Sequence, residues 1–355
     1  MKTSIFFIAS LIIAFIISCE TPSNIEIEAE NLALNLLKEG ETPGMAITVF
    51  KDNQLVWSCG LGFADLENRT EVFPDKTRFR IGSISKSLTS AAIGILMSEE
   101  KLNLDAPIQE YLPDFPVKRW GITSRQLSGH LAGIRHYNGE EYLSAKYYPT
   151  VTEGLTIFQD DSLLFEPGTK YQYSSYGYNL LSAIIEVASK QDFLTFMEES
   201  IFTPLNMNYT VADLKDTIIT HRSGFYSMNN GQVVNAPYVD NSYKWAGGGY
   251  LSTSDDIARF GNAILFSELL KEEIVNELIT SQKLTNGELT GYGIGWSSGT
   301  NEFERNYYGH GGGSVGGSCN LIIFPEEKLV ISALTNDTRS KVGNDLHELA
   351  ELFMK

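Results

Sequence analysis

The sequence has 355 residues, of which 43% are hydrophobic, 11% aromatic and 20% charged, as in an ordinary globular protein. This composition excludes a disordered or collagen-like chain, and the length allows two or three compact units. The 27 basic residues are outnumbered by 44 acidic residues, which gives a net charge of −17. Because this charge repels phosphate backbones, nucleic acid is not expected as a partner.

The N-terminus is predicted to be an export signal. Lys2 supplies a positive charge, and an apolar run from Ile5 to Ile17 follows. This run is shorter than the roughly 20 residues that a membrane-spanning helix needs. The run ends at Ser18 and Cys19, which resemble a bacterial lipobox, in which the cysteine is diacylated; a plain secretory signal is the alternative. We therefore expect a lipid on Cys19 and an anchored location in the bacterial cell envelope.

Taken in chain order, the two ends of the sequence mix helix and strand signals. Helical spacing covers Asn31 to Lys38, strand alternation runs from Gly44 to Phe50 and from Gln54 to Trp57 around a turn at Lys51-Asp52-Asn53, further strands are predicted over residues 291–296, 318–324 and 329–334, and a closing helix over 342–353. The middle of the chain instead indicates helices and long loops, most clearly over residues 179–189 and 255–266.

This arrangement predicts an α/β (α+β) protein in which both chain ends form one sheet. Residues 1–18 are the predicted signal, 19–25 the tether and 26–355 the folded body. Within that body we expect a sheet part at about 26–104 and 283–355, and a helical part at about 105–282. The functional site is expected in the cleft between these parts.

Two further cysteines lie inside apolar, strand-like segments. Cys59 ends the run from Leu55, and Cys319 begins the run to Phe324. An oxidising compartment would allow them to form a disulfide. Two buried free thiols are the simpler expectation, because the sequence does not place the two cysteines close together.

A candidate nucleophile opens an apolar helical run. Ser83 and Lys86 are three residues apart, which places both side chains on one helix face. A serine hydroxyl is a poor nucleophile alone, but an amine in a desolvated cleft can accept its proton, and a helix N-terminus favours the developing negative charge. The alternative is that Ser83 merely caps the helix.

The run from Phe79 to Lys86 resembles the nucleophile segment of the serine β-lactamase-like hydrolases, the family of class C β-lactamases and D-alanyl-D-alanine carboxypeptidases. Further family-like segments are Ile122 to Leu127, Gly129-His130, Gly133 to Arg135, Phe165 to Thr169 and Gly247 to Asp255. The resemblance spans about residues 44–334. It implies an antiparallel sheet flanked by helices, an all-helical subdomain and an active site in the cleft between them.

The second family motif is Tyr-x-Asn, and Tyr173-Ser174-Ser175 occupies its place. The resemblance makes Tyr173 the candidate base, with Lys86 as the cation that favours its ionised or strongly hydrogen-bonding form. Ser175 departs from the substrate-contacting Asn of the family, a variation that looks most like the branch containing mitochondrial serine β-lactamase-like protein and its bacterial relatives. The alternative is that Tyr173 only packs, as tyrosines also occur at positions 171, 176 and 178.

The third motif, Lys-Thr-Gly or His-x-Gly in the family, is matched by His310-Gly311-Gly312. The resemblance implies that Gly312 and Gly313 lie beside the substrate and that the amides of Ser83 and Gly313 form an oxyanion hole. His310 would orient Tyr173 or a substrate carboxylate. A turn histidine in a glycine-rich loop is the alternative.

Other site types fit the sequence poorly. Gly312 to Gly316 satisfies the Gly-x-Ser-x-Gly pattern of α/β-hydrolases, but a strand rather than a helix follows it. Gly60 to Ala64 lacks the helix that a dinucleotide-binding turn requires. No clustered Cys/His set indicates a metal, and no cofactor is expected.

The sequence therefore predicts a serine hydrolase that acts through an acyl-enzyme on amide or ester bonds. A peptidase or esterase is favoured, because Ser175 and His310 both depart from the β-lactamase pattern. The expected partner is a small peptide, ester or cell-wall-derived substrate. The alternatives are a class C-like β-lactamase or D,D-carboxypeptidase, and a non-catalytic relative that binds peptidoglycan or peptide or assembles with itself.

Overall fold

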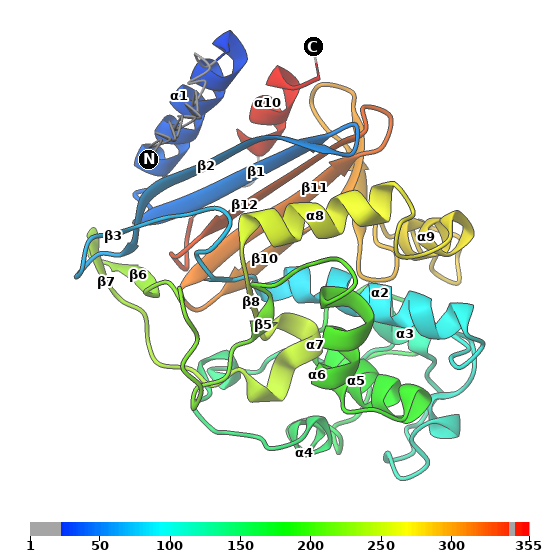
Figure 1. The fold of residues 1–355 in the computed structure, drawn as a ribbon. Coiled ribbons are helices and arrows are strands. Elements are labelled where there is room, and N and C mark those ends of the chain that lie inside the picture. Colours follow the sequence, from blue (N-terminus) through cyan, green and yellow to red (C-terminus); the bar gives the residue numbers. More distant parts are fainter. Residues whose placement is uncertain (1–22, 341–344, 355) are drawn as a thin grey trace, which may run out of the picture.

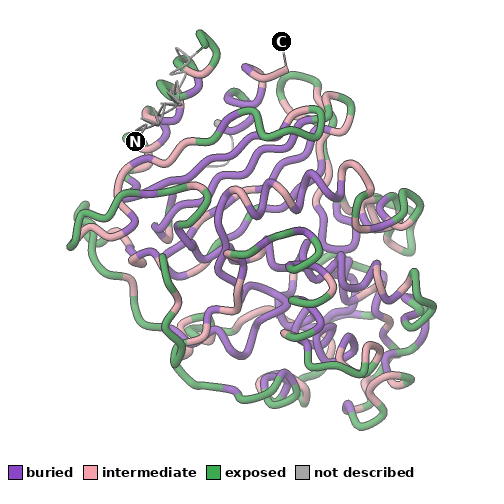
Figure 2. The backbone as a smooth tube through the Cα atoms, viewed as in Figure 1, coloured by how far each residue is buried: buried purple, intermediate pink, exposed green. Residues whose placement is uncertain are grey.

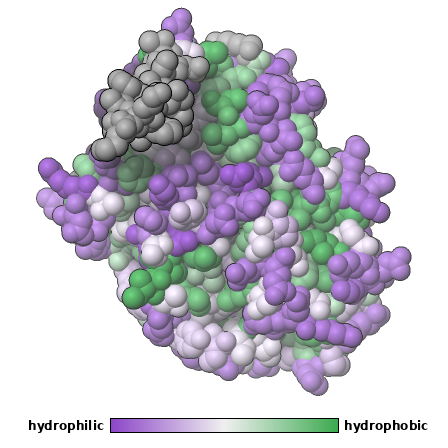
Figure 3. Space-filling model, in the orientation of Figure 1, coloured by the Kyte–Doolittle hydropathy of each residue, from purple (hydrophilic) through white to green (hydrophobic). Residues whose placement is uncertain are grey.

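The computed structural model describes residues 23–340 and 345–354. The predicted signal at residues 1–18 and the predicted lipid on Cys19 lie outside these ranges. Among the described residues, no helix combines the length and apolar character needed to cross a membrane. The face shown in Figure 3 is largely hydrophilic, with hydrophobic side chains in separate patches.

A seven-stranded antiparallel sheet is built from both ends of the chain (Figure 1). The strand order is β3-β2-β1-β12-β11-β10-β9, so β1 from the N-terminal part pairs directly with β12 from the C-terminal part. The strands are β1 Gly44–Lys51, β2 Gln54–Asp65, β3 Thr70–Glu71, β9 Ser297–Thr300, β10 Asn306–Ser314, β11 Gly317–Phe324 and β12 Leu329–Thr335. The predicted α+β architecture, with one sheet from both chain ends, is confirmed.

The hairpin between β1 and β2 forms where the sequence predicts it. Asp52 and Asn53 are the two loop residues, and their φ angles are 48° and 66°. Two consecutive positive φ values are typical of the tight turns whose twist matches that of the flanking strands, and Asp and Asn tolerate them better than most residues.

The predicted strand over residues 291–296 is wrong. Gly291 and Gly295 adopt φ angles of 71° and 79°, far from the extended values of regular strand backbone. Within this segment, Tyr292 forms only an isolated bridge with Ser297. Apolar alternation resembled a strand here, but the glycines bend the backbone instead.

Both faces of the sheet are covered, so its central strands are buried at most positions (Figure 2). Met45 and Ile47 of β1 pack in a cluster with α1 and α10 on one face. Ala46 and Phe50 belong to the core on the opposite face, where α8 packs against β1, β11 and β12. The covering helices are α1 Asn24–Glu39, α8 Ser254–Leu265 and α10 Asp345–Leu352.

Helix α1 begins earlier than the sequence spacing predicts. The Ser23 hydroxyl accepts a hydrogen bond from the backbone of Glu26 (3.2 Å), and the Glu26 carboxylate accepts one from the backbone of Ser23 (2.6 Å). This capping box starts the helix at Asn24. The predicted tether over residues 19–25 is therefore wrong at its last two positions, which are helical.

The part of the molecule outside the seven-stranded sheet is mainly helical. Its helices are α2 Ser85–Ser98, α3 Ser124–Ser128, α4 Val151–Leu155, α5 Ser175–Ser189, α6 Phe193–Met197, α7 Trp245–Gly248 and α9 Glu272–Ile279, with short strands β4 Phe79–Arg80, β5 Val211–Ala212, β6 Tyr226–Asn229, β7 Gln232–Asn235 and β8 Tyr250–Ser252. The predicted helices over 179–189 and 255–266 correspond to α5 and α8.

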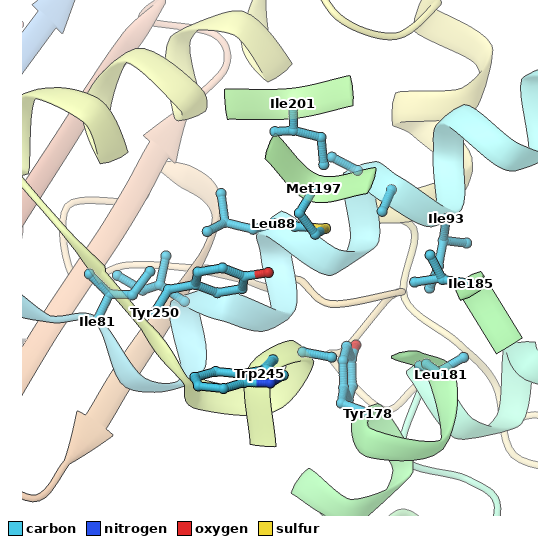
Figure 4. Close-up of a cluster of buried hydrophobic side chains, with 14 of the residues drawn as sticks. Ile81, Leu88, Ile93, Tyr178, Leu181, Ile185, Met197, Ile201, Trp245 and Tyr250 are labelled. Atoms are coloured by element: carbon cyan, nitrogen blue, oxygen red, sulfur yellow. The ribbon is translucent and has the colours of Figure 1, made fainter. Parts of the chain in front are cut away.

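Helix α2 is the central element of this part. It contacts α5, α7 and α9, and every residue from Ser85 to Gly94 is buried. Figure 4 shows Leu88 of α2 beside Met197 and Tyr250. A helix that is buried on all sides has a rigid position, which matters because the candidate nucleophile directly precedes it.

The boundaries of the sheet part and the helical part stay a prediction. Helix α8 lies within the predicted helical range of 105–282, yet it packs on the sheet.

Candidate active site

Ser83 lies in a single 3₁₀ turn, Gly82–Ile84, directly before α2. The turn needs glycine at position 82, because a Cβ there would be 2.6 Å from the carbonyl oxygen of Gly313. Helix α2 has no side-chain cap, so the interpretation of Ser83 as a helix cap is wrong. The partly exposed Ser83 side chain instead lines a cavity.

Lys86 is fully buried one helical turn after Ser83. Its Nζ lies 3.0 Å from the Ser83 hydroxyl, 3.1 Å from the Ser175 hydroxyl and 2.6 Å from the carbonyl oxygen of Gly247. Burial lowers the pKa of Lys86 well below its usual value, and the neighbouring cation Lys244 lowers it further.

Tyr173 and Ser175 lie at the start of α5 and line the same cavity as Ser83. The helix start is fixed by the Ser174 hydroxyl, which accepts a capping hydrogen bond from the backbone of Gly177. The Lys86 Nζ lies 4.9 Å from the centre of the Tyr173 ring. Burial raises the pKa of Tyr173, and a hydrogen bond with the Ser83 side chain only partly opposes this effect. Burial therefore favours the neutral phenol, and the role of Tyr173 as a base beside Lys86 stays a prediction.

The neighbouring tyrosines have other positions. Tyr176 donates a hydrogen bond to Glu141 (2.8 Å), and Tyr178 donates one to the carbonyl oxygen of Ser128 (2.8 Å). Tyr171 is 39% exposed and is not part of the cavity wall. Of these tyrosines, Tyr173 alone lines the cavity beside Ser83.

Strand β10 forms the opposite wall, and its three predicted site residues differ. Gly313 lines the cavity and has open space where a Cβ would lie. Gly312 faces away: a Cβ there would lie 2.1 Å from the carbonyl oxygen of Ile81 and 2.4 Å from the Sγ of Cys319. Gly312 is thus a packing position rather than a cavity-lining one.

His310 is buried behind the cavity rather than in its wall. Its Nε2 lies 2.8 Å from the Tyr292 hydroxyl, and its Nδ1 is hydrogen bonded to the carbonyl oxygen of Gly311. Since only a protonated Nδ1 can donate to a carbonyl, Nε2 accepts from Tyr292. Burial and the nearby Lys86 lower the pKa of His310 to about 3, so the imidazole is neutral. No hydrogen bond connects His310 with Tyr173 among the described residues.

The cavity has a volume of about 410 Å³. Its lining comprises Ser83, His136, Tyr137, Gly139, Tyr142, Tyr173, Ser175, Lys244, Gly247, Gly248, Gly313, Ser314, Val315 and Thr338. A second cavity of about 440 Å³, at Arg78 and residues 217–220, shares none of these residues.

Among the lining residues that were not proposed from the sequence, His136, Tyr137 and Lys244 make the most informative contacts. Nδ1 of His136 accepts a hydrogen bond from the backbone of Ser175 (3.1 Å), and burial together with Lys86 lowers the pKa of His136 to about 4. Tyr137 is hydrogen bonded to the Ser175 side chain, and Lys244 comes from the segment before α7. The family-like run around Gly133 pointed near the first two, whereas no motif marks Lys244.

Cys59 and Cys319 are both free, as expected, but only Cys319 is buried as the expectation required. Cys319 is buried, and its thiol donates to the carbonyl oxygen of Ile81 at 2.8 Å, directly behind the turn that carries Ser83. Cys59 is half-buried on β2. No group of three or more potential metal ligands occurs among the described residues.

The family model for beta-lactamase matches residues 29–353. The chain belongs to the beta-lactamase family. It is 34% identical to the mitochondrial serine beta-lactamase-like protein of Bos taurus, in a match that covers 87% of this chain and 73% of the relative. The identity to the Homo sapiens protein is also 34%, over 85% of this chain and 72% of the relative. Among solved structures, the octameric penicillin-binding protein homologue from Pyrococcus abyssi is 26% identical, with a TM-score of 0.78 over 92% of this chain and 77% of that one.

Family membership supports the general class of acyl-enzyme serine hydrolase and the β-lactamase/penicillin-binding-protein-like fold. The predicted location in a bacterial cell envelope is wrong, because the relatives at 34% identity are mitochondrial proteins. The predicted lipid on Cys19 lies outside the described residues and receives no support from these relatives.

Proposed function

We propose that this chain is an active serine hydrolase that cleaves amide or ester bonds through an acyl-enzyme on Ser83. The observation that carries this proposal is the 3.0 Å distance between the Ser83 hydroxyl and Nζ of the fully buried Lys86. Burial favours the uncharged amine, which lowers the pKa of Lys86. An uncharged amine at this distance accepts the serine proton and makes Ser83 nucleophilic.

The hydrogen bonds of Lys86 fit this protonation state. A neutral amine has two hydrogens and one lone pair. The hydrogens are directed at the Gly247 carbonyl and the Ser175 hydroxyl, at 2.6 and 3.1 Å. The lone pair is then left for the hydroxyl hydrogen of Ser83. Ser175 therefore positions the base Lys86, whereas the Asn at this place in the family motif contacts the substrate through its amide.

Tyr173 is proposed as the acid of the first step, in place of the base inferred from the resemblance. Its raised pKa keeps the phenol protonated at neutral pH. As the Ser83 oxygen bonds to the carbonyl carbon, Lys86 takes the serine proton; as the tetrahedral intermediate collapses, Tyr173 gives its proton to the leaving nitrogen or oxygen. The proton on Lys86 then passes to the Tyr173 phenolate, which restores both groups. Water releases the acyl group by the same transfers in reverse order.

We also propose that the backbone amides of Ser83 and Gly313 stabilise the oxyanion. Gly82 and Gly313 lie in backbone contact, which places the nucleophile turn against β10. A Cβ on Gly313 would meet open space, so the cavity reaches the strand itself. A pair of such donors supplies several kcal/mol of transition-state stabilisation in hydrolases generally.

A small peptide or ester is the proposed substrate, and a β-lactam is disfavoured. The hydroxyl of Ser175 is already bonded to Lys86, and His310 is bonded to Tyr292 behind the cavity. Neither position therefore offers the substrate contacts that the β-lactamase pattern assigns to it. In the same proposal, the site lies between a sheet part of about 26–104 and 283–355 and a helical part of about 105–282.

A fluorophosphonate probe with mass spectrometry of the labelled peptide tests the proposal directly. The expected label is on Ser83, and heat-unfolded protein should not be labelled. The labelling rate should fall as pH is lowered, because protonation of Lys86 removes the base. A folded protein that remains unlabelled over the neutral range, or that is labelled at another serine, would contradict the proposal.

A further inference from the structure

The active-site cavity contains a second buried lysine that the mechanism above does not use. Lys244 lines the cavity and is only 6% exposed. It lies close enough to Lys86 and His136 to lower the pKa of both. Burial lowers the pKa of Lys244 itself to about 7, with a further contribution from Arg80.

The ammonium group of Lys244 has no hydrogen-bond or ion-pair partner within the described part of the chain. Its recorded neighbours are the rings of Tyr243 and Tyr137, whose centres are 5.3 and 5.7 Å from Nζ. Every comparable buried cation nearby is satisfied: Lys86 makes three polar contacts, and Arg80 is bonded to Asp213 at 2.7 Å.

Asp213 does not serve as the missing anion. Its carboxylate is bonded to Arg80 at 2.7 Å and accepts from the Asn241 side chain at 2.8 Å, and Arg222 lies 3.5 Å away. It raises the pKa of Lys244, but less than burial and Arg80 lower it. The charge of Asp213 is therefore already shared among other donors, and Lys244 remains uncompensated.

The backbone that carries Lys244 is held firmly. The backbone amide of Lys244 donates to the carbonyl oxygen of Asn241 at 3.1 Å, and the Ser242 hydroxyl accepts from the backbone of Tyr148 at 2.8 Å. Helix α7 begins at the next residue, and its Gly247 carbonyl binds Lys86. One short segment thus positions both lysines, so their spacing is rigid.

The cavity is positive in an otherwise acidic protein. None of its described lining residues is Asp or Glu, while the whole chain has a net charge of −17. An unpaired ammonium in a buried site is unfavourable, and a carboxylate that enters removes this penalty while forming a charge-assisted hydrogen bond. A neutral substrate of the same shape gains neither effect.

We infer that Lys244 is a specificity-determining residue that binds a carboxylate of the substrate in the cavity beside Ser83. This inference rests on the proposed hydrolase function. The carboxylate can belong to the acyl part of the substrate, as in an Asp or Glu side chain, or to the leaving group, as in a peptide with a free C-terminus.

Two matched substrate pairs distinguish these sources. The first pair is an acetylated tripeptide aminocoumarin amide that ends in Asp or in Asn, which varies the acyl side. The second is an acetyl-alanyl thioester of mercaptoacetate or of mercaptoacetamide, which varies the leaving group. We expect wild type to favour the acid of one pair by about 10- to 100-fold in kcat/KM, the range of a buried charge-assisted hydrogen bond.

Three variants test whether Lys244 causes this preference. Lys244→Met should reduce the ratio of acid to neutral substrate to within about twofold of one, and Lys244→Arg should retain most of the ratio because it keeps the charge. Lys76→Met is the control, since Lys76 is exposed, pairs only with exposed Asp75 and lies outside the cavity lining. Equal rates for acid and neutral substrates in wild type, or a preference that survives in Lys244→Met, would overturn the inference.

A binding experiment separates this inference from the proposed catalysis. Calorimetry with glutarate and with neutral glutaramide uses Ser83→Ala, which cannot turn over substrate. Glutarate should bind at least tenfold more tightly than glutaramide, and adding Lys244→Met should remove the difference. Failure of Ser83 to react with fluorophosphonate contradicts the hydrolase alone, whereas equal affinity for both ligands contradicts the role of Lys244 alone.

Discussion

The two walls of the cavity differ in what they contribute. The helical wall supplies side chains, with Ser83 and Lys86 from the start of α2 and Tyr173 from the start of α5. The β10 wall supplies backbone at Gly313, which has no side chain, while His310 of the same strand is bonded to Tyr292 and does not line the cavity. The groups proposed to move protons therefore lie on the helical side, whereas the proposed oxyanion site takes one amide from each side, those of Ser83 and Gly313. Substitutions on the helical wall should affect chemistry, and those on β10 packing or geometry.

The largest effect is expected at the nucleophile. Ser83→Ala should abolish measurable turnover of any amide or ester, because it removes the proposed nucleophile. Its free energy of unfolding should stay within about 0.5 kcal/mol of wild type, since Ser83 caps no helix. Turnover assays with a chromogenic ester and thermal unfolding measure the two quantities. Full activity in a folded Ser83→Ala protein would refute the assignment.

The second largest effect should come from the proposed acid. Tyr173→Phe removes one oxygen and is expected to lower kcat by about 10² to 10⁴, the usual contribution of a positioned acid or base. Tyr171→Phe and Tyr176→Phe are matched controls, because neither residue lines the cavity. We expect them to keep kcat within about threefold, although loss of the Tyr176 bond to Glu141 should lower the melting temperature.

Unchanged kcat in Tyr173→Phe would mean that the phenol oxygen is dispensable. A loss of kcat that follows the melting temperature across the three Phe variants would instead indicate a packing role for Tyr173.

The sequence predicted the helical wall better than the β10 wall, for a physical reason. Ser83 and Lys86 are close because one helical turn joins them, so their spacing in the sequence is their spacing in space. The orientation of His310 and Gly312 depends instead on distant residues, namely Tyr292 and Ile81.

Lys244 shows the limit of sequence reasoning most clearly. Nothing in its local sequence differs from that of a surface lysine, and its importance comes only from burial beside Lys86 without an anion. The sheet was easier to predict, because β1, β11 and β12 are apolar runs buried on both faces. The strand prediction at residues 291–296 failed because Gly291 and Gly295 adopt positive φ angles, which the alternation of apolar residues does not reveal.

The third prediction compares two adjacent glycines of β10. Gly312→Ala would place a methyl group against the Ile81 carbonyl and the Cys319 thiol, which should destabilise the fold by about 1–3 kcal/mol or more. Gly313→Ala meets open space and should change the free energy of unfolding by less than about 0.5 kcal/mol. Chemical denaturation measures both variants. Equal destabilisation would show that the two positions are not on opposite sides of the strand as described.

The smallest catalytic effect is expected at His310. Because its hydrogen bonds go to Tyr292 and Gly311 rather than to Tyr173, His310→Gln should lower kcat/KM by less than about tenfold. The family resemblance instead assigns His310 a direct role, which would give a larger loss. Tyr292→Phe deletes the same hydrogen bond from its other end and leaves the cavity lining intact.

A double-mutant cycle decides between these views. If His310 acts only through Tyr292, the combined variant should be no worse than the more impaired single variant, which is a non-additive result. If His310 contacts substrate itself, His310→Gln should be impaired even in the Tyr292→Phe background, and by a similar factor. Measuring kcat and KM separately sharpens the result, because a substrate contact changes KM for acidic and neutral substrates differently, whereas support of the wall through Tyr292 affects both alike.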